Sequence, residues 1–122
     1  MSTHHGIDYI ELGVTDLAAA KAFYTAAFGW AFTDYGPGYA GIVAPDREGE
    51  VGGLNTAREP GRTGPLVLLF SQDLDATADA ITAAGGEVVE GPYPFPGGRR
   101  LHFVDPSGNE LGVWASASQN EG

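Results

Sequence analysis

Residues 99–115 read RRLHFVDPSGNELGVWA, two apolar segments separated by a short polar turn. Within the turn, Asp105 can accept hydrogen bonds from the backbone amides that follow it, the next residue is a proline with restricted φ, and Gly108 tolerates a positive φ. Leucine, valine and aromatic residues on both sides favour extended backbone. The stretch therefore predicts a β-hairpin with strands at residues 99–104 and 110–115.

A capped helix followed by a glycine occurs twice in the chain. Asp16 precedes residues 17–28, in which apolar side chains recur at steps of three and four, and Gly29 follows. Asp73 and Gly86 stand in the same places around a second helical pattern, 57 residues further on (73 − 16 = 57). Aspartate is a common N-cap and glycine commonly follows the last helical turn, so the sequence predicts two helices related by duplication.

Short strands are predicted around both helices. A polar Gly/Pro segment at residues 58–64 separates a first module, residues 1–60, from a second module, residues 61–122, within one compact domain. The predicted strands are residues 7–14, 30–35, 39–43 and 50–56 in the first module, and 65–70, 87–91, 99–104 and 110–115 in the second. One β-α-β-β-β sheet alone leaves a face and its edges bare. We therefore predict an α+β fold in which the two tandem modules form a curved, cup-like eight-stranded sheet with the helices outside.

Composition limits the kinds of partner and site. The 122 residues include 16 acidic and six basic side chains, a formal charge of −10, which disfavours nucleic acid and membrane surfaces as partners. The absence of cysteine excludes disulfides, thiolate metal sites and a cysteine nucleophile. No apolar run reaches membrane-spanning length, and the N-terminus lacks the pattern of a secretory signal. We therefore expect a cytoplasmic protein.

Several local motifs occur together. The first half contains VTDL at residues 14–17 and FGW at 28–30, and its helix contains AFY. The second half contains GGEV at residues 85–88, then a Gly-Pro pair and FVDPSGN at 103–109. This combination resembles the vicinal oxygen chelate superfamily, which includes glyoxalase I, bleomycin-resistance proteins and extradiol dioxygenases. The resemblance implies the paired-module fold and says little about the reaction.

The resemblance also implies where a metal site would lie, because the metal enzymes of that superfamily hold one divalent ion with His, Glu or Gln from four strands. The matching positions in this chain are Tyr9, Asn55, Leu66 and Gly112. Leucine and glycine cannot coordinate, and neutral tyrosine and a single asparagine are poor ligands. A shift of the alignment by one residue adds only the carboxylate of Asp8. We therefore expect no metal and no other cofactor in the cup.

Strand alternation predicts which side chains line the cup instead. Glu11 shares a face with Tyr9, and a five-residue turn would pair His102 with Gly112 and place both in the cup. A four-residue turn would send the histidine to the other face. Aromatic residues of the first half supply the rim. The predicted ligand-binding residues are Tyr9, Glu11, Trp30, Tyr39, Asn55, His102 and Trp114.

Three titratable side chains, His102, Glu11 and Glu110, are the candidates for acid–base chemistry. A desolvated His102 beside a carboxylate would be a credible proton shuttle, although a histidine that is simply hydrogen-bonded within the sheet is the more common case. Glu11 has an equally simple alternative, an ion pair with Arg99 or Arg100. The identity of any catalytic residue therefore stays open.

An aromatic cup with carboxylates suits a flat or cationic organic molecule. We therefore predict a small-molecule-binding protein without the usual metal site, which sequesters its ligand or performs modest acid–base chemistry. The alternative is a metal-dependent lyase, isomerase or dioxygenase with ligands relocated to Glu11, His102 and Glu110, and a protein that only scaffolds a dimer is a third class. An exposed sheet edge predicts a homodimer, with the modules pairing either within one chain or between two.

Overall fold

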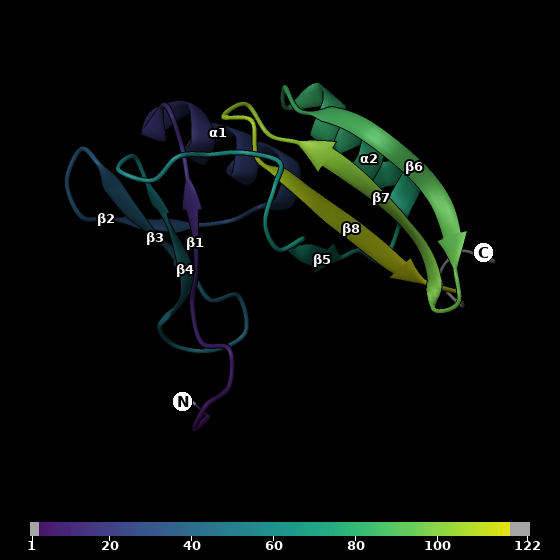
Figure 1. Ribbon diagram of the computed structural model, residues 1–122, viewed down its shortest axis with the longest axis horizontal. Helices are drawn as coiled ribbons and strands as arrows, with labels where there is room; N and C mark the ends of the chain where they lie inside the picture. The colour runs from purple at the N-terminus through teal and green to yellow at the C-terminus, as the bar shows by residue number, and fades with distance from the viewer. Residues whose placement is uncertain (1–2, 118–122) are drawn as a thin grey trace.

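The computed structural model describes residues 3–117, which contain two helices and eight strands (Figure 1). The first half comprises β1 (Ile10–Gly13), α1 (Leu17–Phe28), β2 (Phe32–Asp34), β3 (Tyr39–Val43) and β4 (Glu50–Asn55). The second comprises β5 (Leu68–Phe70), α2 (Leu74–Ala83), β6 (Glu87–Phe95), β7 (Gly98–Val104) and β8 (Glu110–Ser116). The order β-α-β-β-β occurs twice, as predicted. Neither helix of the described part is long and apolar enough to cross a membrane.

The ends of the helices follow from local sequence. The carboxylate of Asp16 accepts a 3.0 Å hydrogen bond from the amide of Ala19, and that of Asp73 accepts one of 3.1 Å from Ala76. Each aspartate thereby satisfies an amide that has no partner inside its helix. Gly29 follows α1 with a φ of 74°, a left-handed conformation that glycine adopts without strain. The predicted duplication is confirmed at the two N-caps, whereas the left-handed glycine after α2 is Gly85, with a φ of 104°, and not Gly86.

Each half of the chain forms its own four-stranded sheet, in the orders β1-β4-β3-β2 and β5-β8-β7-β6. The first strand of each sheet runs parallel to the last, and the remaining pairs are antiparallel. The α+β fold of two modules is confirmed, but the eight strands are divided between two sheets and do not form one continuous ladder. The edge strands β1 and β5 are also shorter than predicted and begin three residues later. Figure 1 shows one sheet at each side of the molecule, with the helices above and behind.

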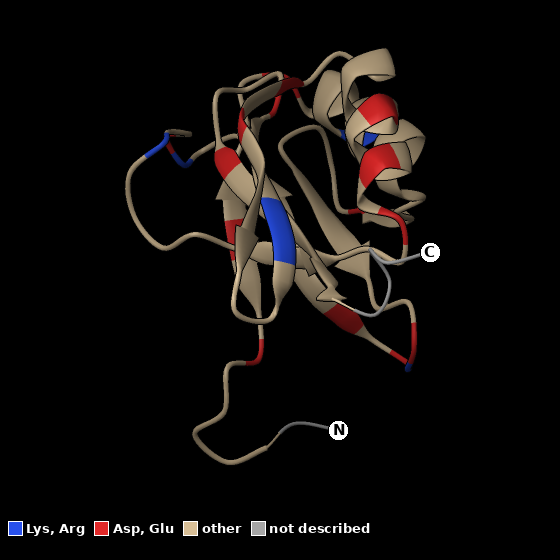
Figure 2. Cartoon of the chain, turned by 90° about the vertical axis from the view of Figure 1, so that its right-hand side faces the viewer, with Lys and Arg blue, Asp and Glu red and all other residues tan. Residues whose placement is uncertain are grey.

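The main hydrophobic core joins the two halves. Helix α1 belongs to the first half, but its Phe23 ring lies 6.0 Å from the ring of Phe103 on β7. Helix α2 covers the same face of the second sheet (Figure 2). Because α1 packs on both the first sheet and this shared core, the halves are held together by apolar burial. The buried members are Phe23, Tyr24, Leu74, Ile81, Leu101, Phe103, Leu111, Val113 and Ala115.

The hairpin turn between β7 and β8 forms as predicted and also connects the halves. One oxygen of Asp105 accepts 2.9 Å hydrogen bonds from the three backbone amides of residues 107–109. The side-chain amide of Asn109 donates a 2.7 Å hydrogen bond to the carbonyl of Gly13 at the end of β1. Both turn side chains are buried, so these polar contacts are made away from water. The turn of the predicted hairpin therefore also links the two modules.

Candidate functional site

Each sheet has one face packed on the helices and one face that no helix covers, here called the open face. On β8, Leu111 and Val113 are buried in the helix-covered core, so the alternating Gly112 points to the open face. The register pairs His102 with Gly112 and Val104 with Glu110. The predicted five-residue turn is therefore correct, and His102 lies on the open face of the second sheet.

The open face of the first sheet carries a group that we call the tyrosine cluster, defined as Tyr9, Glu11, Tyr35, Tyr39, Glu50 and Asn55. The hydroxyls of Tyr9 and Tyr39 are hydrogen-bonded to each other. Asn55 donates a 3.2 Å hydrogen bond to a carboxylate oxygen of Glu11. A hydrogen bond between Tyr39 and Glu11 joins these two pairs, so two tyrosines, an amide and a carboxylate form one polar group.

Burial and the two carboxylates of the tyrosine cluster raise the pKa of the phenols of Tyr35 and Tyr39. The hydroxyl of Tyr35 donates a 2.6 Å hydrogen bond to Glu50, and this bond raises the pKa of Tyr35. Burial raises the pKa of Tyr39 most, and its hydrogen bonds with Tyr9 and Glu11 raise it further. These tyrosines therefore offer neutral aromatic rings beside negative charge.

Glycines form the floor beneath the tyrosine cluster. Gly41 and Gly53 are directly paired on β3 and β4. A Cβ at Gly53 would overlap the hydroxyl of Tyr39 and would lie 2.7 Å from that of Tyr9, while one at Gly41 would overlap the carboxylate of Glu50. The absence of side chains lets these polar groups lie flat over the sheet.

A cavity of about 440 Å³ borders the tyrosine cluster. It lies between β1, the linker (residues 58–64) and the start of β5. Glu11 lines it together with Arg58 of the linker, whose guanidinium Nε lies 4.0 Å from that carboxylate. Ile10 and Val67 supply apolar wall, and Asn109 of the turn supplies polar wall. The volume and the mixed lining are typical of a small-molecule pocket.

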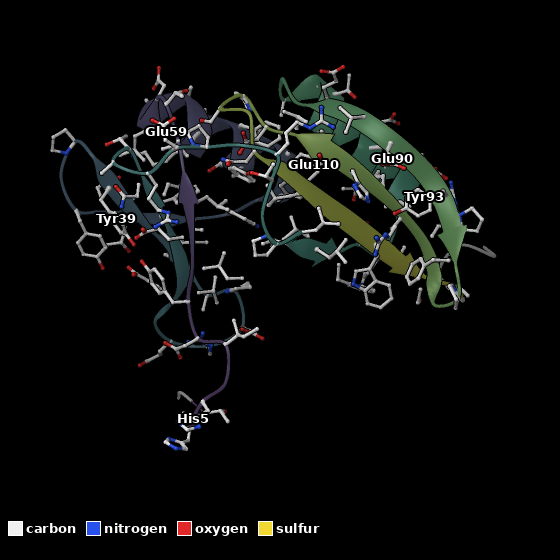
Figure 3. All side chains as sticks on the ribbon, viewed as in Figure 1. His5, Tyr39, Glu59, Glu90, Tyr93 and Glu110 are labelled. Carbon is white, nitrogen blue, oxygen red and sulfur yellow. The ribbon has the colours of Figure 1, made fainter. Side chains whose placement is uncertain are left out.

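The open face of the second sheet carries the histidine cluster, defined as Arg62, Tyr93, Arg100, His102 and Glu110. His102 contacts Glu110 through Nδ1, at 2.7 Å, and the hydroxyl of Tyr93 through Nε2, at 2.9 Å. Arg100 donates a 2.5 Å hydrogen bond to the oxygen of Tyr93, and Arg62 donates one of 2.9 Å to Glu110. Figure 3 shows Tyr93 and Glu110 on this sheet. Residues of three strands and the linker thus form one hydrogen-bonded network.

Glu110 is the negative centre of the histidine cluster. Its hydrogen bond with His102, and then that with Arg62, lower the pKa of the Glu110 carboxyl below its ordinary value. The side chains of His102 and Glu110 are only 13% and 16% exposed. An ionised carboxylate can only accept, so Nδ1 of the neutral imidazole carries the hydrogen and Nε2 is left as the acceptor.

The predicted site residues fall into two groups, one on each sheet. Four of them, Tyr9, Glu11, Tyr39 and Asn55, meet in the tyrosine cluster. His102 lies on the second sheet, and in Figure 3 Tyr39 and the histidine-bonded Tyr93 stand at opposite sides of the molecule. Within residues 3–117 the two groups therefore lie on different sheets.

The two tryptophans take different positions. Trp30 lies on the helix-covered side, stacked on Tyr24 with ring centroids 4.5 Å apart, so it is separated from the other predicted ligand-binding residues. Trp114 lies on the open face of β8, where its ring is 5.0 Å from Phe70 and 6.2 Å from Phe95. These three rings form an aromatic patch next to the histidine cluster.

The positions implied for a metal do not offer a ligand set. Tyr9 is engaged by another phenol, Asn55 is bonded to Glu11, and a Cβ at Gly112 would press against the side chain of Leu68. Leu66 has no donor atom. Within residues 3–117 the structure places no three His, Asp or Glu side chains together as a metal-binding group. The residues at these positions therefore do not fit a divalent ion.

Sequence reasoning missed five members of these sites: Glu50, Tyr93, Arg100, Arg58 and Arg62. The prediction ended β6 at residue 91 because a Gly-Pro pair is a turn signal, whereas β6 continues to Phe95 with two irregularities in its pairing. The suggestion that Glu11 pairs with Arg99 or Arg100 is wrong, because its cationic neighbour is Arg58 of the linker. Strand alternation could have identified Arg100, because it lies two residues before His102 on the same strand and therefore on the same face.

Two curated proteins are similar in sequence to most of this chain. CFP32 of Mycobacterium bovis is 30% identical over 115 residues, which cover 88% of this chain and 44% of CFP32. The anthracycline biosynthesis protein DauV of Streptomyces sp. strain C5 is 32% identical over 125 residues, covering 87% of this chain and 45% of DauV. This chain therefore spans less than half the length of these curated relatives.

A solved structure shares the fold of this chain, and a family model shows its family. TnmS3, an antibiotic binding protein from Streptomyces sp. CB03234, has a TM-score of 0.69 at 24% identity, over 95% of this chain and 98% of its own. A sequence model of the Glyoxalase/Bleomycin resistance protein/Dioxygenase superfamily matches residues 6–113. With the match extending over nearly all of the two modules, this chain belongs to the Glyoxalase/Bleomycin resistance protein/Dioxygenase superfamily.

Proposed function

We propose that this protein binds a small aromatic molecule, preferably one carrying a positive charge, at the open faces of its sheets and without a metal ion. The observation that carries the proposal is the tyrosine cluster, in which the rings of Tyr35 and Tyr39 lie 6.3 Å apart between the carboxylates of Glu11 and Glu50. Aromatic faces attract cations and stack on flat ligands, and carboxylates add charge attraction. The adjoining cavity of about 440 Å³ has room for such a molecule.

Two similar proteins support a small organic ligand, and the name of one of them points to an aromatic one. TnmS3 is an antibiotic binding protein, and DauV is an anthracycline biosynthesis protein. Anthracyclines are flat fused-ring molecules, many of which carry an amino sugar that is positively charged at neutral pH. A ligand of this kind matches both the rings and the carboxylates of the tyrosine cluster, and the overall charge of −10 would attract it.

We also propose that the protein is a homodimer. Strands β1 and β5 each form one edge of their sheet, and large apolar side chains are exposed there: Ile7, before β1, at 93% and Phe70, in β5, at 54%. Exposed edges with large apolar residues favour association with another chain, and a second copy is the partner always present. Light scattering should give twice the monomer mass at micromolar concentration, and Phe70→Lys should shift the mass toward the monomer. A monomeric wild type would refute the proposal.

The ligand proposal is tested by titration with an amino-sugar anthracycline and with its uncharged aglycone, followed by tryptophan fluorescence and melting temperature. A ligand selective for the folded state must raise the melting temperature. We expect the amine to bind about tenfold more tightly than the aglycone, a difference of about 1.4 kcal/mol. Glu11→Gln should reduce this preference, whereas Asp75→Asn, exposed on α2, should preserve it.

Two results would contradict the ligand proposal. Unchanged melting temperatures at saturating anthracycline and aglycone would argue against an aromatic ligand. Stoichiometric Ni, Zn, Mn or Fe in protein purified without a histidine tag would favour the metal-dependent alternative, in which Glu11, His102 and Glu110 act as relocated ligands.

A further inference from the structure

The histidine cluster ends at a phenol. Glu110, His102 and Tyr93 are joined in that order by hydrogen bonds of 2.7 and 2.9 Å, and Arg100 reaches the phenolic oxygen from the other side at 2.5 Å. We propose that Tyr93 is an activated acid–base group, able to take a proton from a bound organic molecule and to return it. This inference rests on the part of the proposed function that has a small molecule bind at the open face of the second sheet, apart from the tyrosine cluster on the first.

The strand register holds the residues of the histidine cluster in place. Tyr93 on β6 is paired directly with Arg100 on β7, and Glu90 is paired with His102. The next strand, β8, places Gly112 opposite the imidazole, so no side chain stands over it from that position. Contacts anchored on three neighbouring strands are more rigid than contacts made by loops.

The hydrogen-bond directions favour transfer of the Tyr93 proton. Because Glu110 accepts at Nδ1 of His102, the lone pair of Nε2 points to the hydroxyl of Tyr93 and can receive its proton. The imidazolium so formed lies 2.7 Å from Glu110 and 3.9 Å from a carboxylate oxygen of Glu90, both negative. This is the arrangement by which a neighbouring base activates a hydroxyl.

Two arginines adjust the charge balance of the transfer. The guanidinium of Arg100 contacts the phenolic oxygen and stabilises the negative charge that forms there. Arg62 binds the other oxygen of Glu110 and partly offsets the attraction of that carboxylate for an imidazolium. The groups facing the histidine are thus Glu90 from β6, Arg100 from its own strand, Glu110 from β8 and Arg62 through that glutamate.

The other tyrosines provide an internal contrast, since the structure describes all five. Tyr24 is buried and donates to Asp105, and Tyr35 donates to Glu50; burial and carboxylates raise the pKa of both hydroxyls. Tyr93 instead faces a nitrogen base and a guanidinium, and its side chain is partly exposed. Its hydroxyl contacts a base and a cation, whereas those of Tyr24 and Tyr35 contact carboxylates.

The chemistry needs no further reactant. The proton of Tyr93 moves to Nε2 of His102, and the phenolate oxygen then takes a proton from a C–H next to a carbonyl, or from an O–H, of the ligand. The electron pair of the broken bond stays on the ligand as an enolate or phenolate. Return of the proton to a different atom or face gives an isomer, so atoms and charges balance. The ligand class is an enolisable ketone or a phenol.

An arylsulfonyl fluoride tests the reactivity of Tyr93 without any knowledge of the ligand. The phenolate oxygen attacks sulfur, the S–F bond breaks, fluoride leaves, and the phenolic proton remains on His102. Peptide mapping by mass spectrometry then measures the labelling rate of each tyrosine. We expect Tyr93 to be labelled at least about tenfold faster than Tyr35.

Variants of the neighbouring residues show whether Tyr93 is labelled fast because it is activated or only because it is exposed. His102→Gln and Arg100→Met should each slow the labelling of Tyr93 about tenfold, while Arg100→Lys should restore part of the rate. Tyr35 labelling should be unchanged in all of them. Circular dichroism checks folding, and if the histidine variant unfolds the arginine pair carries the test.

Two outcomes would overturn the inference: Tyr93 labelled no faster than Tyr35, or a labelling rate of Tyr93 unaffected in folded His102→Gln and Arg100→Met. Since the readout is a reaction of the protein itself, it can fail or succeed separately from the anthracycline titration.

Discussion

The hydroxyl of Tyr24 donates a 2.7 Å hydrogen bond to Asp105, which is 81 residues away in the sequence. Burial, and then the charge of Asp105, raise the pKa of Tyr24, so its hydroxyl remains a donor across the physiological range. The other oxygen of Asp105 accepts the backbone amides of its own turn. One buried carboxylate therefore closes the hairpin of the second module and holds the helix of the first.

Removing this hydroxyl should weaken the connection between the modules. Tyr24→Phe keeps the ring in the core and removes one hydrogen bond to a buried charge, so we expect a loss of about 2 kcal/mol in the free energy of unfolding. The matched control is Tyr35→Phe, at a 59% exposed position, which should cost less than about 0.5 kcal/mol. Urea denaturation measures both, and equal losses would show that the Tyr24–Asp105 contact contributes little.

Asn109 should be coupled to this contact. Its side chain donates to Gly13 at 2.7 Å and to Asp105 at 3.1 Å, and it accepts from Gly61 at 3.0 Å. Asn109→Ala should cost about 2 kcal/mol, the net value of two to three hydrogen bonds. Because Tyr24 donates to the same oxygen of Asp105, the double variant should deviate from additivity by about 0.5 kcal/mol or more. Additive losses in urea denaturation would indicate that the two side chains act independently.

Two adjacent glycines of β4 should respond differently to alanine. A Cβ at Gly52 would overlap the backbone carbonyl of Ile10, whereas one at Gly53 would meet the movable hydroxyl ends of Tyr39 and Tyr9. Gly52→Ala should therefore lower the free energy of unfolding by about 3 kcal/mol, the upper part of the range for overpacking.

Gly53→Ala should cost less than Gly52→Ala but displace the tyrosine pair and weaken binding of the amino-sugar anthracycline. Thermal unfolding and the fluorescence titration, carried out on both variants, separate the two effects. If Gly53→Ala left the titration unchanged, the tyrosine cluster would not be the recognition surface.

Lowering the pH should remove the stability that the ionised Glu110 contributes to the folded state. The folded state lowers the pKa of this carboxyl below the ordinary value of 4.5, so its contribution is present above that value and is lost as the pH falls through the folded value. We expect Glu110→Gln to lower the melting temperature at neutral pH and to match the wild type in strong acid. Glu48→Gln, in an exposed loop, is the control and should show no such convergence. A constant difference at every pH would contradict the assignment.

Local chemistry is what the sequence alone could predict. Asp16 and Asp73 cap their helices because a carboxylate three residues before a free amide can reach it in any tertiary context. The turn after Asp105 is equally local, and its length sets the register that places His102 opposite Gly112. The helices, the hairpin and the face of the histidine were therefore predictable from short-range patterns.

The longer-range part of the site was not predictable in this way. Tyr93 enters the histidine cluster because β6 continues past its Gly-Pro pair and bends to stay paired with β7. Arg58 and Arg62 come from a linker whose path depends on where the modules pack. Trp30 turns to the core because Tyr24 offers it a stacking partner there.

The sequence by itself determined the two modules, their caps and the alternation of their strands, since these depend on contacts between residues a few positions apart. Only the tertiary structure decided that the strands form two sheets, and that the tyrosine and histidine clusters lie on different sheets. The physical reason is that the packing of α1 against both halves is chosen by the total apolar area buried, which no local pattern contains.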